Sequence, residues 1–189
     1  MEERERTKEL CRVGEKIFAR HFRESIAYLQ EKYTKEEEWE KVERMLREAW
    51  EEGKRAGKKS PWLGILYSHI SLLQRTHEFL FLVTEENLVL DEDPVERWGR
   101  FPHFFERYEE DMKKVMKELE RTYPRIQTYE ENQVREACAP YYYAGVRGLL
   151  EGRIERLKGF CTGGELYFGR YRGEGWILGK EGKKWKGKN

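Results

Sequence analysis

The segment SPWLGILYSHISLLQRTHEFLFLVTEENLVLD, residues 60–91, decides the fold of this chain. Its first half, Ser60 to Gln74, contains no Asp, Glu, Lys or Arg, although these residue types make up 39% of the sequence. Apolar side chains leave water when a chain folds, so an uncharged stretch in a highly charged chain is expected at the centre of the core. The remaining segments should therefore pack around residues 60–91.

Two kinds of structure are predicted within this segment. Ser60 and Pro61 suit the N-cap and the first position of a helix, and the almost wholly apolar residues 62–75 predict a buried helix. The composition that follows is typical of a β-hairpin, with strands at Glu78–Val83 and Leu88–Asp91 on either side of a polar turn.

Helices are predicted on the N-terminal side of this centre. Residues 3–33 carry apolar side chains at the three- and four-residue spacing of an amphipathic helix. Thr34 and Glu37 have the spacing of a capping box and predict the start of a second helix, which ends near Gly53. The short turn between them predicts a helical hairpin over residues 1–57.

The segments after residue 91 are predicted as follows. Asp93 starts a short helical turn that ends near Trp98, and residues 102–122 form the most regular amphipathic helix. A further helix spans residues 129–157, where the interior Pro140 predicts a kink, a break or a junction of two helices.

The sequence thus predicts an α+β, predominantly α-helical fold in one compact domain. Glycines and alternating residues predict a small C-terminal β-hairpin near residues 165–179, followed by a basic tail. The parts are an N-terminal helical hairpin (1–57), a helical core with a β-hairpin near 78–91 (60–158), and the C-terminal hairpin with its tail (159–189). The edges of the first hairpin need a cover, which the second hairpin would supply in a monomer and a second chain in a homodimer.

The cysteines and the chain start indicate the compartment. Cys11, Cys138 and Cys161 are far apart and odd in number, which argues against a disulfide framework or a structural zinc site. The start MEERERTKEL is too charged for a signal peptide, and no stretch is apolar for long enough to span a membrane. We therefore expect a cytoplasmic protein that does not bind membranes.

Charge is balanced overall but not along the chain. The sequence has 37 basic and 36 acidic residues, whereas residues 153–189 carry 10 basic and 4 acidic ones. Basic side chains neutralise phosphates and aromatic rings stack on unpaired bases, so this end is a candidate nucleic-acid surface. Its candidate residues are Arg170, Arg172, Trp176, Lys180, Lys183, Lys184, Trp185 and Lys186. The alternative is an ordinary solvated terminus with Trp176 packed inward.

Motifs for catalysis are missing. The sequence has no HExxH, no phosphate-binding loop and no GxSxG, and no cofactor is predicted. Asp91 and Asp93 follow a predicted strand, where divalent-metal nucleases place carboxylate ligands. The alternative for this pair is the N-terminus of a helix, which favours acidic residues.

Tyr141, Tyr142 and Tyr143 stand next to Pro140. Consecutive helical residues point about 100° apart, so at least one of the three rings must face away from the core. Tyr141 and Tyr143 are therefore candidate partner contacts. The alternative is a hydroxyl that donates to the carbonyl left free by the proline.

These observations favour a non-enzymatic interaction or regulatory protein that binds a protein partner. A surplus of tryptophans predicted to be exposed, because they stand among charged residues, supports this hypothesis, since tyrosine and tryptophan are enriched at interfaces. The tryptophans concerned are Trp39, Trp50, Trp98 and Trp185. The alternatives are a nucleic-acid-binding protein that uses the C-terminal segment and a metal-dependent nuclease that uses Asp91 and Asp93.

Overall fold

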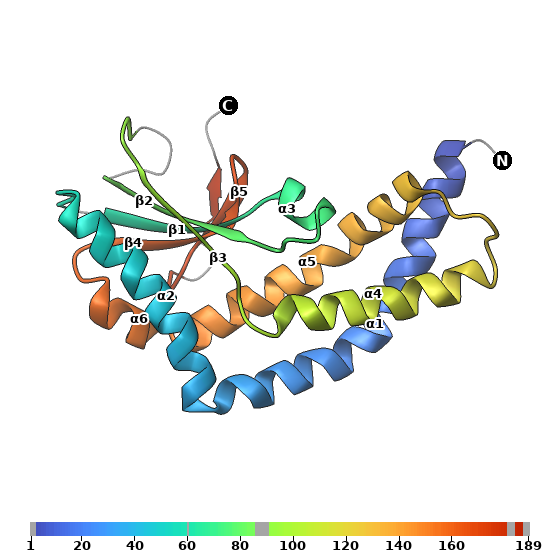
Figure 1. Ribbon diagram of the computed structural model, residues 1–189, viewed down its shortest axis with the longest axis horizontal. Coiled ribbons are helices and arrows are strands. Elements are labelled where there is room, and N and C mark those ends of the chain that lie inside the picture. The colour runs from blue at the N-terminus through green and yellow to red at the C-terminus, as the bar shows by residue number, and fades with distance from the viewer. Residues whose placement is uncertain (1–2, 60, 86–90, 181–183, 187–189) are drawn as a thin grey trace.

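The computed structural model describes residues 3–59, 61–85, 91–180 and 184–186. The fold is α+β and mainly helical, which confirms the predicted class, and helices cover one face of a mixed β-sheet (Figure 1). The helices are α1 (Glu3–Thr34), α2 (Glu36–Arg55), α3 (His69–Leu73), α4 (Phe104–Glu120), α5 (Thr128–Gly152) and α6 (Ile154–Phe160). The strands are β1 (Pro61–Tyr67), β2 (Phe79–Glu85), β3 (Val95–Gly99), β4 (Glu165–Arg170), β5 (Glu174–Ile177) and β6 (Lys184–Lys186).

Strand β1 is central in the sheet, whose order is β3-β2-β1-β4-β5-β6. It pairs antiparallel with β2 and parallel with β4, while the β2–β3, β4–β5 and β5–β6 pairs are antiparallel. The predicted C-terminal hairpin is confirmed as β4 and β5, and β1 joins it to β2 and β3. The first strand of the hairpin predicted near 78–91 and the C-terminal hairpin therefore belong to one sheet of one chain.

The prediction of a helix over residues 62–75 is wrong for most of that segment. The chain forms strand β1 over Pro61–Tyr67, and only His69–Leu73 is helical. Leu63 and Ile65 belong to the main core beneath the sheet, whereas Leu66 packs in a smaller cluster with residues of the opposite face. A strand buried on both faces has no polar alternation, so its sequence resembles that of a buried helix.

The short helical turn predicted from Asp93 to Trp98 is also wrong. Residues Val95–Gly99 form strand β3, which pairs with β2 so that Trp98 lies opposite Leu80. The predicted return strand Leu88–Asp91 lies outside the described residues, apart from Asp91. Pairing with β2 is the tertiary influence that overrides the local helix-start signal.

The long N-terminal helices and the short turn between them are as predicted. The capping box at Thr34 is wrong, because Lys35 is the N-cap without a side-chain cap and the Thr34 hydroxyl donates to the carbonyl of Glu31 at 2.5 Å. Beyond the turn, α2 leaves α1 at an angle and lies against the sheet (Figure 1). A Cβ atom on Gly53 would overlap with Val83, so this glycine permits close packing of α2 on β2.

Helix α5 is continuous through Pro140, and the next helix begins at Ile154. The predicted break or junction at the proline is therefore wrong. The helix lies between α1, α4 and the sheet, and tertiary packing of this kind offsets a local loss of helix stability.

Aromatic side chains dominate the core between α1, α4 and α5. The rings of Phe18, Tyr108 and Tyr142 meet with centroids 5.4–5.9 Å apart. Trp39 and Trp50 are 0% and 1% exposed, so the prediction that both are exposed is wrong. Each lies on the apolar face of α2, and its charged neighbours in sequence point the other way.

Of the other two predicted surface tryptophans, Trp98 is 54% exposed, and the side chain of Trp185 lies outside the description. Among the described helices, none is both long and apolar enough to cross a membrane.

Candidate functional site

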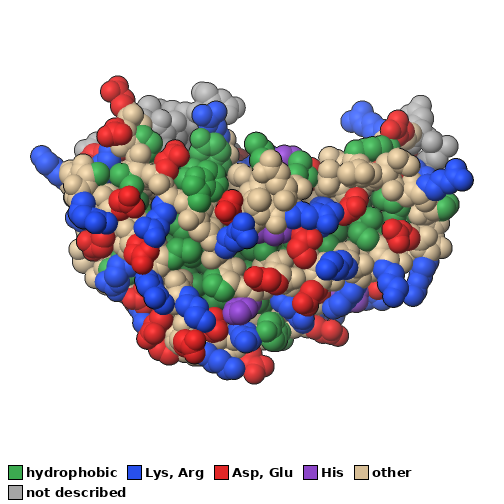
Figure 2. Space-filling view, in the orientation of Figure 1, with side chains coloured by type: hydrophobic (Ala, Val, Ile, Leu, Met, Phe, Trp, Pro, Cys, Tyr) green, Lys and Arg blue, Asp and Glu red, His purple; other side chains and the backbone are tan. Residues whose placement is uncertain are grey.

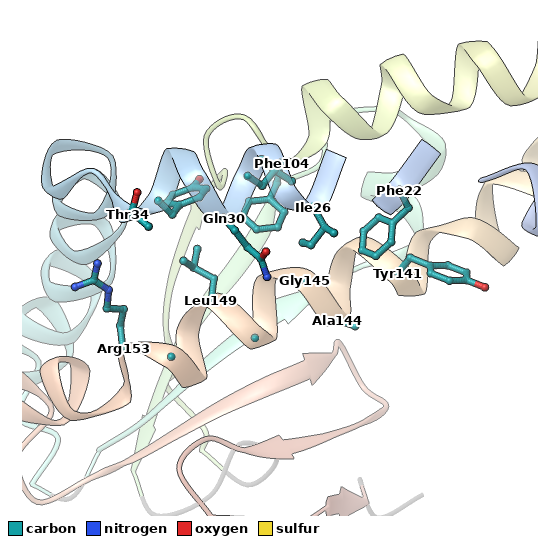
Figure 3. Close-up of a pocket in the computed structure, with 14 residues that line it drawn as sticks. Phe22, Ile26, Gln30, Thr34, Phe104, Tyr141, Ala144, Gly145, Leu149 and Arg153 are labelled. Carbon is teal, nitrogen blue, oxygen red and sulfur yellow. The ribbon is translucent and has the colours of Figure 1, made fainter. Parts of the chain in front are cut away.

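An apolar trough runs between the second half of α1 and the second half of α5 (Figure 3). Its volume is about 600 Å³, within the range of ligand-binding pockets. The two helices run side by side in the same direction, so Phe22 lies near Tyr141 at one end and Thr34 near Arg153 at the other. Thirteen helical residues, as in 22–34, span about 18 Å.

Glycines of α5 shape one wall of the trough. A Cβ atom on Gly145 would lie 3.1 Å from Ile26 and 3.2 Å from Phe104, so this glycine is needed for close packing within the chain. Gly148 and Gly152 differ, because a Cβ atom on either would meet nothing within 4 Å. Glycine inside a helix costs about 1 kcal/mol relative to alanine, and no contact within the described residues explains its presence at position 148, while Gly152 is the last residue of α5.

The floor of the trough is fixed by buried aromatic rings. Tyr33 is 3% exposed, donates a hydrogen bond to the carbonyl of Pro102, and packs against Phe104 with ring centroids 5.4 Å apart. Burial raises the pKa of the Tyr33 phenol beyond its usual range, and the nearby carboxylates of Glu38 and Glu106 raise it further. Tyr33 therefore remains a neutral hydrogen-bond donor that holds the base of the trough.

One lining side chain of the trough is charged, and it is positive. The guanidinium of Arg153 lies 5.7 Å from the ring centroid of Trp39, and no carboxylate pairs with it in the described part of the chain. Thr34 adds a polar group at the same end, and Gln30 adds one near Gly145, in the middle of the trough (Figure 3). The trough thus offers a long apolar surface with a cation at one end.

The three consecutive tyrosines point in different directions, as predicted. Tyr141 is half-buried beside Phe18 and lines the trough, whereas the buried Tyr142 donates to Asp111 at 2.9 Å. Tyr143 is 9% exposed and stacks on Tyr67. The two candidate partner residues thus occupy different environments, and only Tyr141 reaches the trough.

The basic C-terminal residues are not gathered into one described surface. Trp176 is half-buried with the Arg147 guanidinium 4.5 Å from its ring centroid, and Lys180 forms an ion pair with Glu165. The exposed Arg170 lies at the end of β4.

The remaining candidates of this segment are placed as follows. Arg172 lies on the turn before β5, and Lys184 lies in β6. Lys183 and the side chains of Trp185 and Lys186 fall outside the description. Figure 2 shows acidic and basic side chains interspersed on the visible face of the helical layer, so that face carries no field of one sign.

Asp91 and Asp93 are not brought together with further ligands. Both Asp91 carboxylate oxygens accept from the Lys58 ammonium, at 2.7 and 2.8 Å, and Asp91 also accepts from the backbone N–H groups of Glu85 and Asp93. The Lys58 hydrogen bond outweighs burial and lowers the pKa of Asp91. No group of three or more metal-binding side chains occurs within the described residues. Asp91 therefore ties β2 and the following segment to the end of α2.

Sequence reasoning missed a buried charged junction between α4 and α5. Glu109 is paired with both His77 and Arg135, and the Arg135 side chain is 2% exposed. Burial raises the pKa of Glu109, but hydrogen bonds from His77 and Arg135 outweigh it and bring the pKa to about 2. No motif marks these residues, because they are 26 and 32 positions apart in sequence.

Comparison with known proteins found no relative of this chain. No protein-family model, curated protein or solved structure matches the chain.

Proposed function

We propose that this chain is a non-enzymatic binding protein whose α1–α5 trough receives an amphipathic helix from a protein partner. The observation that supports this proposal is the trough itself, an apolar surface about 600 Å³ in volume that includes Tyr141. Proteins commonly bind a partner helix by laying its apolar face into such a groove.

The shape of the trough favours a helix over a compact small molecule. Its length of about 18 Å equals three turns of helix, which would present apolar residues at positions i, i+3, i+4 and i+7. Gly148 and Gly152 leave the backbone of α5 uncovered on this wall. A second backbone can approach closely over such residues, so the two glycines fit a partner helix.

Charge complementarity defines the partner further. Arg153 is the charged side chain at the Thr34 end of the trough, and it lacks a carboxylate partner within the described residues. A cation in a partly apolar site favours an anionic group opposite to it. The partner helix should therefore carry an Asp or Glu at the end that meets Arg153.

Photocrosslinking tests this proposal. A benzoylphenylalanine residue replaces Gln30, an exposed residue of the trough wall, and the full chain is expressed in cells of its own source. The matched control carries the same residue at Lys113, an exposed position of α4 that does not line the trough. We expect a crosslinked protein from position 30, but not from position 113, with the adduct on an amphipathic helix that contains an acidic residue.

Gly148→Leu should abolish this crosslink by filling the trough. An adduct that survives Gly148→Leu would contradict the proposal. So would native mass spectrometry that finds a small apolar molecule in the trough and no adduct on any protein.

A further inference from the structure

A second cavity lies at the carboxyl ends of β1 and β4, apart from the trough. Its volume is about 240 Å³, and its lining includes Tyr67 and Arg170, the last residues of the two strands. β1 and β4 are parallel neighbours, with Tyr67 in register with Arg170, so both strands end at the same edge of the sheet. In open sheets with parallel strands, ligands bind beyond the carboxyl ends of those strands.

The strand ends and helix α5 together supply hydrogen-bond donors to the cavity. Tyr143 is 9% exposed and stacks on Tyr67, with ring centroids 3.9 Å apart and planes 12° apart. In the part of the chain that the structure describes, neither hydroxyl has a hydrogen-bond partner and Arg170 has no ion pair. Burial raises the pKa of both phenols, so both hydroxyls stay protonated and can donate. Two hydroxyls and a guanidinium suit a carboxylate.

Helix α5, which carries Tyr143, also supplies acceptors. Glu136 and Pro140 of α5 line the cavity, and the Glu136 carboxylate lies 3.3 Å from the His69 imidazole. Pro140 has no N–H, so the carbonyl of Glu136, four residues earlier, lacks the donor that a helix normally provides. A carboxylate and a carbonyl without its helical donor suit an ammonium group, which has donors and no acceptor.

We infer that this cavity binds a small zwitterion, a molecule that carries a carboxylate and an amine as a free amino acid does. The carboxylate binds Arg170 with the Tyr67 and Tyr143 hydroxyls, and the amine binds the carboxylate and carbonyl of Glu136. Leu72 and Ala139 form the apolar part of the lining, which suits a small apolar side chain. Binding of the amine by the Glu136 carbonyl accounts for the presence of Pro140 inside α5. A proline in a helix interior lowers helix stability by about 3 kcal/mol.

Chemical-shift titration of the isotope-labelled full chain tests the inference. The probes are free alanine, serine and leucine, with acetate, methylamine and inorganic phosphate as single-charge controls, each up to about 20 mM so that millimolar dissociation constants are measured. We expect at least one amino acid to shift the amide signals of Arg170 and Tyr143, and to bind at least about tenfold more tightly than acetate or methylamine.

Variants test the donor groups and the acceptor groups of the cavity separately. Arg170→Gln and Glu136→Gln should each weaken binding of that amino acid at least about tenfold, and Tyr143→Phe should weaken it about threefold or more. Pro140→Ala restores an N–H to the Glu136 carbonyl and should weaken binding while the fold is kept. The matched control is Arg172→Gln, which removes a charge from the adjacent turn and should leave the affinity unchanged.

Three results would overturn the inference. The first is no shift with any of the three amino acids, and the second is phosphate or acetate binding as tightly as they do. The third is an affinity that Arg170→Gln and Glu136→Gln leave intact while far-UV circular dichroism shows both variants folded.

Discussion

Helix α5 contributes to two regions that use an arginine in opposite ways. Arg135, in its first half, is buried and paired with Glu109 in a junction that also includes His77. Arg153, directly after its last turn, faces the open trough and has no carboxylate partner within the described residues. The junction is closed and its carboxylate is satisfied, whereas the trough is open and its cation is not.

The contrast separates residues that hold the fold from residues that are available for binding. A buried charge whose partner is removed is strongly destabilising, while a partly exposed one contributes little to stability. The junction should therefore respond to mutation with a loss of stability, and the trough should respond with a loss of binding.

The largest expected effect comes from breaking the junction. Arg135→Met removes a buried cation and leaves the half-buried Glu109 with His77 as its remaining partner, and we expect the free energy of unfolding to fall by about 3–5 kcal/mol. Arg153→Met is the matched comparison and should change it by less than about 1 kcal/mol, the value of an exposed cation–π contact. Urea denaturation of both variants measures the difference. Equal losses would show that the two regions do not differ as described.

The junction should also give a defined acid response. The folded pKa of Glu109, about 2, lies below its ordinary value of 4.5. Its stabilisation is therefore complete above pH 4.5 and is lost as the pH falls towards 2, an effect of about 3 kcal/mol. Unfolding free energies measured against pH should show the wild type losing its advantage over Glu109→Gln across this window. A constant difference between the two proteins from pH 5 to pH 2 would contradict the assignment.

Pro140 provides the next smaller effect. Pro140→Ala returns an N–H to the interior of α5, and we expect the free energy of unfolding to rise by about 1–3 kcal/mol, as judged from the helix penalty of proline. Thermal and urea unfolding measure the gain. A loss of stability would show that the surrounding packing requires the proline ring.

The smallest effects are expected at the trough glycines. Gly148→Leu places a side chain in open space and removes a helix-interior glycine, so it should raise the free energy of unfolding by up to about 1 kcal/mol. Gly152→Leu acts at the last residue of α5 and should give a smaller gain. Gly159→Leu in α6 is the control, because its Cβ atom would also meet nothing within 4 Å and it does not line the trough. A marked loss of stability at position 148 alone would indicate that the trough is filled in solution.

Much of the fold could be predicted from the sequence, because the long helices have a clear period. The stripes of α1, α2 and α4 follow the amphipathic spacing, and the C-terminal hairpin has its turn at Arg172, in a left-handed conformation with φ of 54°. The central strand could not be predicted from its pattern. Both of its faces are buried, so Leu63 and Leu66 give no alternation that would distinguish a strand from a buried helix.

The trough and the other candidate sites depend on contacts between distant segments, which a local sequence pattern does not predict. Tyr141 was predicted as a contact residue from its place beside Pro140, and it lies in the trough. The opposite wall of the trough comes from α1, with Phe104 from α4, more than 35 residues away from Tyr141 in sequence. Gly148, on the same helix as Tyr141, has no sequence feature that marks it as a site residue. Buried tryptophans such as Trp39 were predicted as exposed from their charged neighbours, which ignores the 100° step between helical residues.

The affinity of the crosslinked partner helix for matched glycine variants tests the central claim most directly. A synthetic peptide of that helix is titrated against the wild type, Gly148→Leu and Gly159→Leu by calorimetry. The account predicts equal affinity for the wild type and Gly159→Leu, and at least a tenfold weaker affinity for Gly148→Leu, at a melting temperature no lower than that of the wild type. Equal affinity for all three proteins would contradict the claim that the α1–α5 trough is the binding site.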